Sequence, residues 1–374
     1  MEVVKIRNNQ GKERYYVVDD HGNEIIIILK FIKFKDNIGY SRNSLKMYCY
    51  HLKLYFEYLE EKNKEFQNIT VDDLALFVNW LQTPYNSFKI ASIVSKETTR
   101  CATTINKIVD TVTSFYDYIF KHEEYSNNIS EKVKKVLTSS NKNFKGFLFG
   151  IAYKNEVTIK NTLKLKEPIK KPKTLKKEQI EEIYNECNNL RDKFLISLLY
   201  ETGMRIGEAL SLWLEDIDIA NKTVEIKDRG QLENNAEIKT VTSPRTIDVS
   251  QNIIDIFMEY IEIYHTEDVL TNHIFIKIKG KNKNKAMNYV DVDNLFRYLN
   301  VKIGIHTTAH MFRHSSLTTL RKNGWEPELL RVRAGHKNIY TTLNAYIHPS
   351  SEEIRDEFKR VEENFKMKGD NNNV

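Results

Sequence analysis

The sequence predicts a mainly α-helical protein with a small antiparallel β-sheet (an α+β class), divided into two domains. Three observations support this class. Residues 41–125 repeat apolar side chains at steps of three and four, the period of a helix with one buried face. Residues 223–249 contain short strand-like runs between helical segments. A lysine-rich stretch with two prolines, residues 141–173, separates these regions and is typical of a linker.

Length and composition set the first limits on function. The 374 residues are enough for two ordinary domains with an arm or a tail. No apolar run approaches the roughly 20 residues that a membrane span needs. The three cysteines are widely spaced and lack any Cys-x-x-Cys or Cys/His pattern, which disfavours a disulfide framework and a zinc site. We therefore expect a cytoplasmic protein without a membrane partner.

The N-terminal segment, residues 1–30, is expected to form a β-hairpin arm. Two β-prone runs, at residues 15–18 and 25–29, flank a turn-prone cluster at residues 19–24. A lone hairpin is only marginally stable, so it must pack on its own domain, on a neighbouring subunit or on DNA. The residues leave these three alternatives open.

Residues 31–140 are expected to form a small all-α domain. Thr70 and Asp73 read as a capping box ahead of an apolar helix face. The apolar stripes of these helices are expected to form the core. Polar residues beside the stripes are candidates for contacts with DNA phosphates, namely Arg42, Asn43, Lys46, Arg100, Thr103 and Lys107.

Positive charge is concentrated between the two domains. The net charge is only +6, but residues 141–177 hold eleven lysines against two glutamates. Charge alone fits a solvated linker and a contact with a DNA backbone equally well. The candidates for such a contact are Lys170, Lys171 and Lys173.

The second domain is expected to span residues 174–350. Thr174 is a candidate N-cap for its first helix, and a strongly buried helix should end near Thr202 and Gly203. Strand-like pieces at residues 223–227, 236–241 and 246–249 predict a small antiparallel sheet before helices return.

Short segments of this second domain carry residues suited to phosphoryl transfer without a metal ion. Each signal is weak alone, because the chain has 20 tyrosines and many surface cations. Their order along one domain carries the inference. In chain order they are Arg205 with Glu208 one turn later on the same helix face, Lys239 at the edge of a hairpin turn, His310 and Arg313 on one helix face, His336 after a glycine, and Tyr346 ten residues further on.

The residue types match the steps of a phosphodiester exchange. Two arginines can bind the non-bridging oxygens in a bidentate manner and neutralise the charge that builds up in the transition state. A lysine can donate a proton to the departing 5′ oxygen, and a histidine can accept or donate one near neutral pH. A tyrosine oxygen can act as the nucleophile and divide the exchange into two steps.

With these segments, the sequence resembles the tyrosine recombinase, or phage integrase, family. The marks are Thr-Gly-Met-Arg-Ile-Gly-Glu-Ala-Leu-Ser-Leu at 202–212, Lys-Thr at 239–240 leading to Arg-Thr-Ile at 245–247, His-x-x-Arg-His at 310–314, Ala-Gly-His at 334–336 and Tyr-Ile-His at 346–348. The catalytic resemblance covers about residues 174–360, and residues 31–125 look like the family's SAM-like core-binding domain. Phe312 and Ala334 stand where leucine is usual, both at packing positions. The segment 336–350 looks most like transposon-encoded integrases.

The resemblance implies a role for each residue of the set and no cofactor or metal. Arg205 and Arg313 would bind the scissile phosphate, with Lys239 as general acid. His310 and His336 would hydrogen-bond to the phosphate or transfer protons. Tyr346 would form a 3′-phosphotyrosine, and Glu208 would brace the pocket.

The resemblance also implies an architecture and partners. Two domains would clamp double-stranded DNA, with the basic linker along the duplex, and the protein would assemble into a tetramer on synapsed DNA. Accessory proteins of the element or the host are further candidate partners. An amphipathic helix at residues 351–366 either folds onto its own domain or is donated to the next protomer, and the resemblance favours donation. Residues 367–374 are expected to be disordered.

The expected function is therefore that of a site-specific recombinase or transposase that integrates or excises a mobile element, associated with the nucleoid. Two alternatives remain: relaxation of supercoils, as by a type IB topoisomerase, and a non-catalytic DNA-binding regulator. The integrase-like arrangement favours strand exchange over relaxation. Retention of all six catalytic side chains disfavours the regulator, because binding alone needs neither Tyr346 nor Lys239.

Overall fold

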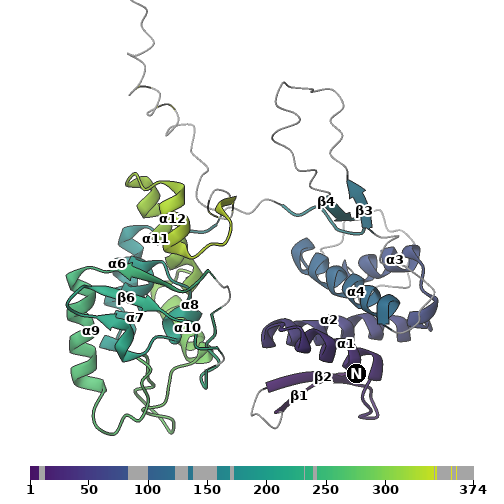
Figure 1. Ribbon diagram of the computed structural model, residues 1–374, viewed down its shortest axis with the longest axis horizontal. Coiled ribbons are helices and arrows are strands. Elements are labelled where there is room, and N and C mark those ends of the chain that lie inside the picture. Colours follow the sequence, from purple (N-terminus) through teal and green to yellow (C-terminus); the bar gives the residue numbers. More distant parts are fainter. Residues whose placement is uncertain are drawn as a thin grey trace, which may run out of the picture. The chain divides into compact units, whose positions relative to one another are not determined.

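The computed structural model divides the chain into two compact units, Met1–Ile169 and Lys170–Val374, each described here by itself (Figure 1). It describes residues 1–7, 13–82, 100–122, 134–137, 158–168, 172–230, 232–238 and 242–340, together with residues 342, 355 and 359. These ranges are mostly helical with small antiparallel sheets, which confirms the predicted class. Within them no helix has the length and apolarity to span a membrane.

Helices build the core of the first unit. In its described part these are α1 (Ile26–Asn37), α2 (Arg42–Glu61), α3 (Val71–Gln82) and α4 (Ala102–His122), with a 3-10 turn at Phe66–Asn68. Aromatic rings fill the space between α2 and α4, and the hydroxyls of Tyr55 and Tyr116 hydrogen-bond to each other at 2.5 Å, which satisfies both inside the core. The predicted capping box is confirmed, because Asp73 N donates to Thr70 Oγ1 and Thr70 N donates to Asp73 Oδ2.

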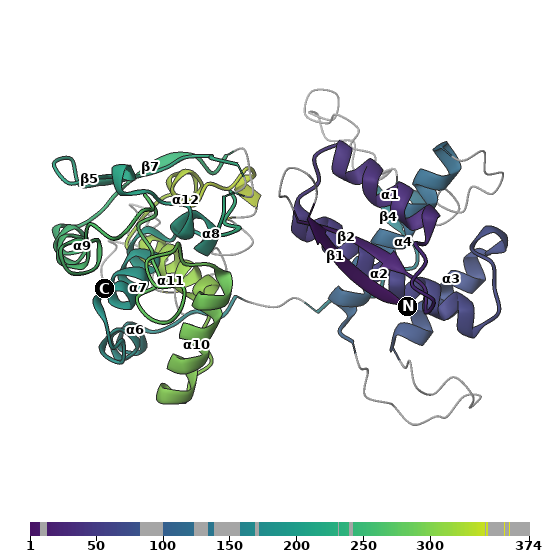
Figure 2. The same cartoon turned by 90° about the horizontal axis from the view of Figure 1, so that it is seen from below.

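The N-terminal hairpin exists, but its second predicted strand was wrong. Strand β1 (Glu2–Arg7) pairs antiparallel with β2 (Glu13–Val18), and residues 26–29 open helix α1 instead. A short apolar run alone does not distinguish a strand from a helix. Here Ile28, Phe31 and Ile32 form the buried face of helix α1. Figure 2 shows the hairpin beside α2. The side chain of Val17 belongs to the helical core of the same unit. Of the three alternatives, the structure places the hairpin on its own unit.

Part of the expected linker packs on the first unit. Strand β4 (Thr158–Asn161) pairs with β3 (Lys134–Leu137), and Leu163 and Leu165 pack against the helical core. Asn106 of α4 holds the backbone of Leu165 from both sides, donating to its carbonyl at 2.9 Å and accepting from its N–H at 2.8 Å. The sequence assigned residues 141–173 to one linker, whereas residues 158–168 are tied to α4.

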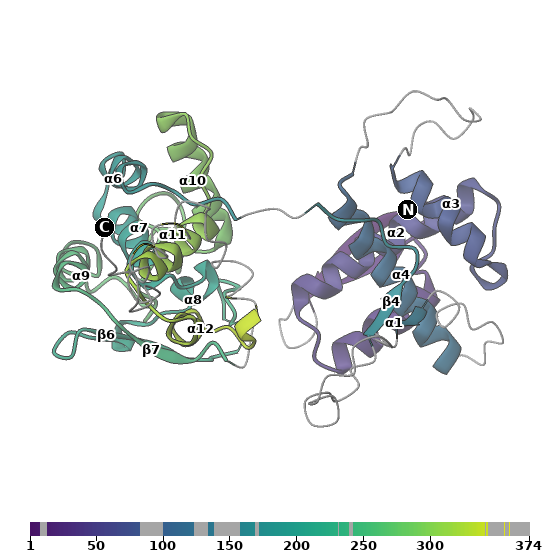
Figure 3. The ribbon, with the colours of Figure 1, turned by 90° about the horizontal axis from the view of Figure 1, so that it is seen from above.

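The second unit is organised around a largely buried central helix. This helix, α7 (Leu190–Thr202), is apolar around most of its circumference, which is the pattern of a central helix. It contacts α6 (Lys177–Asn185), α8 (Ile206–Leu210), α9 (Gln251–Tyr264) and α11 (Ala309–Lys322). Figure 3 shows these helices with α10 (Tyr289–Ile303) and α12 (Pro327–Ala334) around them. Thr174 is not the cap of α6, because the helix begins after Lys176, whose N–H donates to Gln179 Oε1.

The sheet of the second unit differs from the prediction at two points: residues 217–218 form a strand that was not predicted, and residues 236–238 do not form the one that was. Its order is β5 (Ile217–Asp218), β6 (Thr223–Ile226), β7 (Arg245–Asp248), all antiparallel, with β5 just after a 3-10 turn at Leu214–Asp216. Residues 236–238, expected to start a strand, form none. The buried side chain of Asn234 accepts the Ala236 N–H and donates to the carbonyls of Leu210 and Met287, so this segment is fixed as an irregular loop.

Candidate active site

A glycine turn places the first arginine of the site. Helix α7 ends at Gly203, whose φ of 65° lies in the left-handed region. A Cβ there would lie 3.1 Å from Ser316 Oγ, which is tighter than ordinary contact, so the close approach to α11 also favours glycine. Two residues later, Arg205 is the extended N-cap of α8, and its side chain is 21% exposed. The turn therefore leaves the Arg205 guanidinium at the edge of the core.

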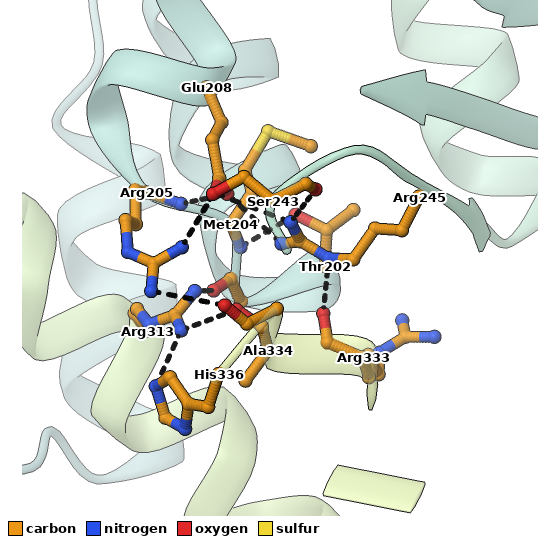
Figure 4. Close-up of polar contacts among 12 residues, drawn as sticks. Thr202, Met204, Arg205, Glu208, Ser243, Arg245, Arg313, Arg333, Ala334 and His336 are labelled. Atoms are coloured by element: carbon orange, nitrogen blue, oxygen red, sulfur yellow. Dashed lines mark hydrogen bonds and ion pairs between the residues drawn. The ribbon is translucent and has the colours of Figure 1, made fainter. Parts of the chain in front are cut away.

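Glu208 is the buried acidic centre of the site, with a side chain only 1% exposed (Figure 4). Arg205 Nη1 donates to Glu208 Oε1 at 2.7 Å, and Arg245 Nη2 donates to Glu208 Oε2 at 3.0 Å. Burial alone would raise the pKa of Glu208, but the hydrogen bond and charge of Arg245, with help from Arg205, outweigh burial and lower it. Glu208 is therefore an ionised carboxylate shared by two arginines.

Arg313 is the most deeply buried cation of the site. Its residue is 1% exposed, and its position on α11 directs the guanidinium toward the ends of α7 and α12. Arg313 Nη1 donates to the Gly203 carbonyl at 2.7 Å, and Nη2 donates to the Ala334 carbonyl at 2.7 Å. Nη2 also donates to His336 Nε2 at 2.9 Å. Arg313 therefore joins three segments that are distant in sequence.

His336 is held in its neutral form. Burial, followed by the charges of Arg313 and Arg205, lowers the pKa of His336 to about 3. Its Nε2 faces Arg313, which can only donate, so Nε2 is the acceptor and the proton resides on Nδ1. Nδ1 then donates to Thr342 Oγ1 at 2.9 Å. The contacts thus fix both the tautomer and the ring orientation.

The C-terminus of α12 is the point on which these cations converge. Arg313 donates to the Ala334 carbonyl, and Arg205 Nη2 donates to the Gly335 carbonyl at 3.4 Å. The carbonyl end of a helix carries partial negative charge, which favours cations there. Gly335 has a φ of 63°, and a Cβ on it would lie 2.8 Å from Arg245 Nη1. Only glycine therefore allows this approach.

The structure brings together four of the seven residues that the sequence singled out for the catalytic site: Arg205, Glu208, Arg313 and His336. His310 lies exposed at the start of α11, with its ring 4.4 Å from that of His314. Lys239 and Tyr346 lie outside the described residues. So does most of the expected C-terminal helix, of which Arg355 and Lys359 are described.

Sequence reasoning gave no role to Arg245, the second partner of Glu208. Arg245 is part of the Arg-Thr-Ile motif at residues 245–247, but its place in the motif does not show which buried group it contacts. The available signal was Glu208 itself, because an ionised carboxylate in the apolar run of α8 requires cationic or hydrogen-bonding partners. Arg333 was also missed. Its carbonyl accepts from Arg245 Nε at 2.6 Å, and its own Nη2 donates to the Glu201 carbonyl at 3.0 Å.

The expected DNA-contact residues of the first unit are partly engaged within the protein. Arg42 pairs with Glu13 of the hairpin at 2.7 Å, and Arg100 Nη1 donates to the Leu81 carbonyl. Thr103 Oγ1 donates to Glu167 Oε2 at 2.8 Å. Asn43, Lys107 and, in the second unit, Lys173 are exposed, Lys46 lies over the Tyr15 ring, and Lys170 and Lys171 fall outside the described residues. Their roles in binding remain predictions.

Acid is expected to destabilise both units. Burial lowers the pKa of His51 in the first unit and His314 in the second to about 4, and that of His336 to about 3. These folded-state values lie below the unfolded value near 6.5, so the unfolded chain binds more protons below that pH. The free energy of unfolding should therefore fall as pH drops from about 6.5 toward 4. Urea unfolding at pH 7.5, 6 and 5 measures this, and an unchanged or rising stability would contradict the three buried neutral histidines.

Comparison with known proteins identifies the family. Residues 173–353 match the phage integrase family, and residues 33–123 match the phage integrase N-terminal SAM-like domain. Transposase A from transposon Tn554 of Staphylococcus aureus is 35% identical over 362 residues, covering 96% of this chain and 98% of that protein. The chain belongs to the phage integrase family. The resemblance drawn from the sequence, including its transposon branch, is thereby confirmed.

More distant members of the phage integrase family align over nearly the whole chain. Tyrosine recombinase XerA of Pyrococcus horikoshii is 21% identical over 351 residues, covering 94% of this chain and 96% of that protein. Among solved structures, the Tn1549 transposon integrase with a circular intermediate DNA has a TM-score of 0.62 at 18% identity, covering 90% of this chain and 99% of that one. The XerH recombinase bound to a palindromic difH substrate has a TM-score of 0.58 at 19% identity, covering 90% and 84%. At these identities the likeness shows a shared fold.

Proposed function

We propose that this phage integrase family member is a site-specific recombinase of a mobile genetic element that cuts and rejoins double-stranded DNA through Tyr346. The observation that carries this proposal is the convergence of Arg205, Arg313 and a neutral His336. Arg313 reaches the Gly203 carbonyl across 110 residues of sequence, and Arg205 reaches the Gly335 carbonyl across 130. A fold that gathers two guanidiniums around one helix end is suited to hold a phosphodiester.

Arg205 and Arg313 would stabilise a bound phosphate in different ways. Arg205 is the more accessible, with its side chain 21% exposed, and would meet a non-bridging oxygen first. Arg313 would supply a second positive charge from inside the unit, where low solvent access strengthens electrostatic attraction. Both charges are in place before DNA arrives, so little reorganisation is needed as negative charge grows in the transition state.

The chemical step conserves the number of phosphodiester bonds. The Tyr346 hydroxyl would release its proton to solvent and its oxygen would bond to phosphorus, while the bond from phosphorus to the 5′ oxygen breaks. The leaving 5′ oxygen would take a proton from Lys239. A 5′ hydroxyl of the exchanging strand would then return a proton to Lys239, attack the 3′-phosphotyrosine and release the Tyr346 oxygen, which takes a proton back from solvent. No oxidant, reductant or nucleotide cofactor enters this balance.

His336 would act as a hydrogen-bonding group whose protonation follows phosphate binding. In the free protein burial lowers its pKa most, and the positive charges of Arg313 and Arg205 lower it further. A bound phosphodiester anion would offset these charges and raise the pKa of His336 toward its ordinary value. The ring could then donate from Nε2 to a phosphate oxygen, provided that Arg313 releases that atom.

The proposed substrate is double-stranded DNA. The Tn1549 integrase and XerH structures were each solved with DNA, which supports the same class of partner here. Assembly into a tetramer on two synapsed duplexes belongs to the same proposal, as does donation of the helix at residues 351–366 to a neighbouring protomer. The net charge of +6 and the lysines of residues 141–177 favour contact with phosphates.

Trapping the covalent intermediate tests this function. Duplexes carrying the ends of the encoding element, nicked close to the cleavage site, would lose the short strand that could reverse the reaction. We expect a protein–DNA adduct that survives denaturing electrophoresis. A folded protein that binds these ends yet forms no adduct would leave the DNA-binding regulator as the better account.

A second assay separates recombination from relaxation. Two differently labelled duplexes with matching sites should yield hybrid joints when the protein exchanges strands. Relaxation of a supercoiled plasmid without such joints would favour the topoisomerase-like alternative, which uses the same phosphotyrosine chemistry on a single duplex.

A further inference from the structure

Arg245 is held by several hydrogen bonds within the site, and nothing in the proposed chemistry uses it. It opens strand β7, six residues after Lys239 in the sequence. Its Nε donates to the Arg333 carbonyl at 2.6 Å, and Nη1 donates to the Ser243 carbonyl at 2.6 Å. Nη1 and Nη2 both donate to the carboxylate of Glu208, at 3.3 and 3.0 Å. Every nitrogen of the guanidinium thus has a protein acceptor (Figure 4).

This geometry disfavours a direct contact between Arg245 and DNA. Its side chain is only 7% exposed, and both of its Nη atoms donate to the buried carboxylate of Glu208. The Arg245 guanidinium would have to abandon a buried carboxylate and two carbonyls to reach a phosphate, and such exchanges leave buried polar groups unpaired. Arg245 therefore acts through its neighbours, of which Glu208 is the charged one.

The charge balance of the cluster shows what Arg245 contributes. Glu208 with Arg205 alone would be neutral, because one carboxylate would cancel one guanidinium. Adding Arg245 gives a cluster of net charge +1, with Glu208 satisfied from both sides. Without Arg245, the buried carboxylate would depend on Arg205 and draw its guanidinium inward. Arg205 would then be less able to meet a phosphate oxygen.

Arg245 also ties together the segments that carry the site. Its contact with the Arg333 carbonyl links β7 to α12, two residues before Gly335. Thr242, three residues before Arg245, donates from Oγ1 to the Gly335 carbonyl at 3.3 Å. Residues 242–245, which follow Lys239 in the sequence, are thereby fixed to the same helix end that receives Arg205 and Arg313.

We propose that Arg245 is a positioning residue, which neutralises Glu208 so that Arg205 stays available to the phosphate and which fixes residues 242–245, the chain that follows Lys239, to α12. The proposal rests on the proposed function, because it assigns Arg245 a part in the same cleavage reaction. It predicts a defect in the chemical step with DNA binding largely retained.

The structure offers a matched control for loss of a buried arginine–carboxylate pair. Arg229 donates through Nη1 and Nη2 to the two oxygens of Asp216, each at 2.8 Å. Its guanidinium lies 4.2 Å from the centre of the Trp213 ring, and its side chain is 13% exposed. Arg229→Gln therefore removes a comparable ion pair of the second unit whose carboxylate is not Glu208.

The experiment compares Arg245→Gln, Arg245→Lys and Arg229→Gln with the wild-type full chain. Single-turnover adduct formation is measured on nicked element-end DNA at saturating protein, alongside DNA affinity and the folded fraction. We expect Arg245→Gln to slow adduct formation roughly 10²-fold, the scale of misplacing a catalytic group. Arg245→Lys should recover part of this rate, because it restores a positive charge beside Glu208. Arg229→Gln should react at the wild-type rate per folded molecule.

The possible outcomes separate this proposal from the proposed function. If Arg245→Gln reacts as fast per folded molecule as Arg229→Gln, the positioning role is overturned while the recombinase assignment stands. A variant that loses DNA binding and reaction rate in proportion would also overturn it, since positioning of Arg205 predicts a slower step on bound DNA. If the wild type and Arg229→Gln both fail to form an adduct, the proposed function is contradicted, and the positioning role of Arg245, which depends on it, is contradicted as well.

Discussion

Replacing Arg313 with alanine is expected to reduce adduct formation by roughly 10³-fold or more, in line with arginines that stabilise phosphoryl-transfer transition states. The alanine removes the buried charge of the site and its hydrogen bonds to the Gly203 and Ala334 carbonyls and to His336. Each unpaired buried acceptor costs about 1–3 kcal/mol, so stability should fall as well. The rate must therefore be measured per folded molecule, by single-turnover cleavage of nicked DNA.

Two further variants separate the chemistry of Arg313 from its structural part. Arg313→Lys keeps the charge but cannot reproduce the planar guanidinium, so we expect it to fold better than Arg313→Ala while remaining strongly impaired. Arg321→Ala changes another arginine near the end of the same helix and should react normally. An Arg313→Ala protein that cleaves within about tenfold of the wild-type rate would show that Arg313 serves the fold and not the reaction. Arginines that stabilise a phosphoryl-transfer transition state raise the rate by much more than that.

Replacing Tyr346 with phenylalanine is expected to abolish the covalent adduct and leave DNA binding unchanged. The substitution removes one oxygen atom, and in the proposed mechanism this atom forms the bond to phosphorus. Electrophoresis of the adduct under denaturing conditions measures the reaction, and a mobility-shift titration on intact DNA measures the affinity.

Tyr340 is a suitable control for this substitution. It lies six residues before Tyr346 in the same segment and is 66% exposed. Tyr340→Phe should form the adduct at the wild-type rate. An adduct that persists in Tyr346→Phe but disappears in Tyr340→Phe would identify Tyr340 as the nucleophile.

Much of the fold followed from local sequence signals. The apolar run of α7 and the glycine at its end predicted a buried helix and its boundary, because both depend on residues adjacent in the chain. The capping box at Thr70 and Asp73 was predictable for the same reason. The hairpin partner of β2 was not, because the run at residues 25–29 suits a strand and a helix equally until its packing against the core is known.

The candidate site was predictable as a set of residues but not as a network. Ordered motifs singled out Arg205, Arg313 and His336, and the structure joins them through backbone carbonyls at the ends of α7 and α12. Contacts with backbone carbonyls cannot be predicted from residue types, because every residue has a carbonyl. The pairing of Glu208 with Arg245 spans 37 residues and depends on the tertiary fold, so the sequence alone showed a motif without its partner.

The most direct test of the account is to find the residue to which DNA is attached. The adduct formed by the wild-type protein on nicked DNA can be digested with nuclease and protease, and the modified peptide sequenced by mass spectrometry. The account predicts a nucleotide joined through a 3′ phosphate to Tyr346. A phosphate joined to any other residue, or a 5′ linkage at Tyr346, would contradict it.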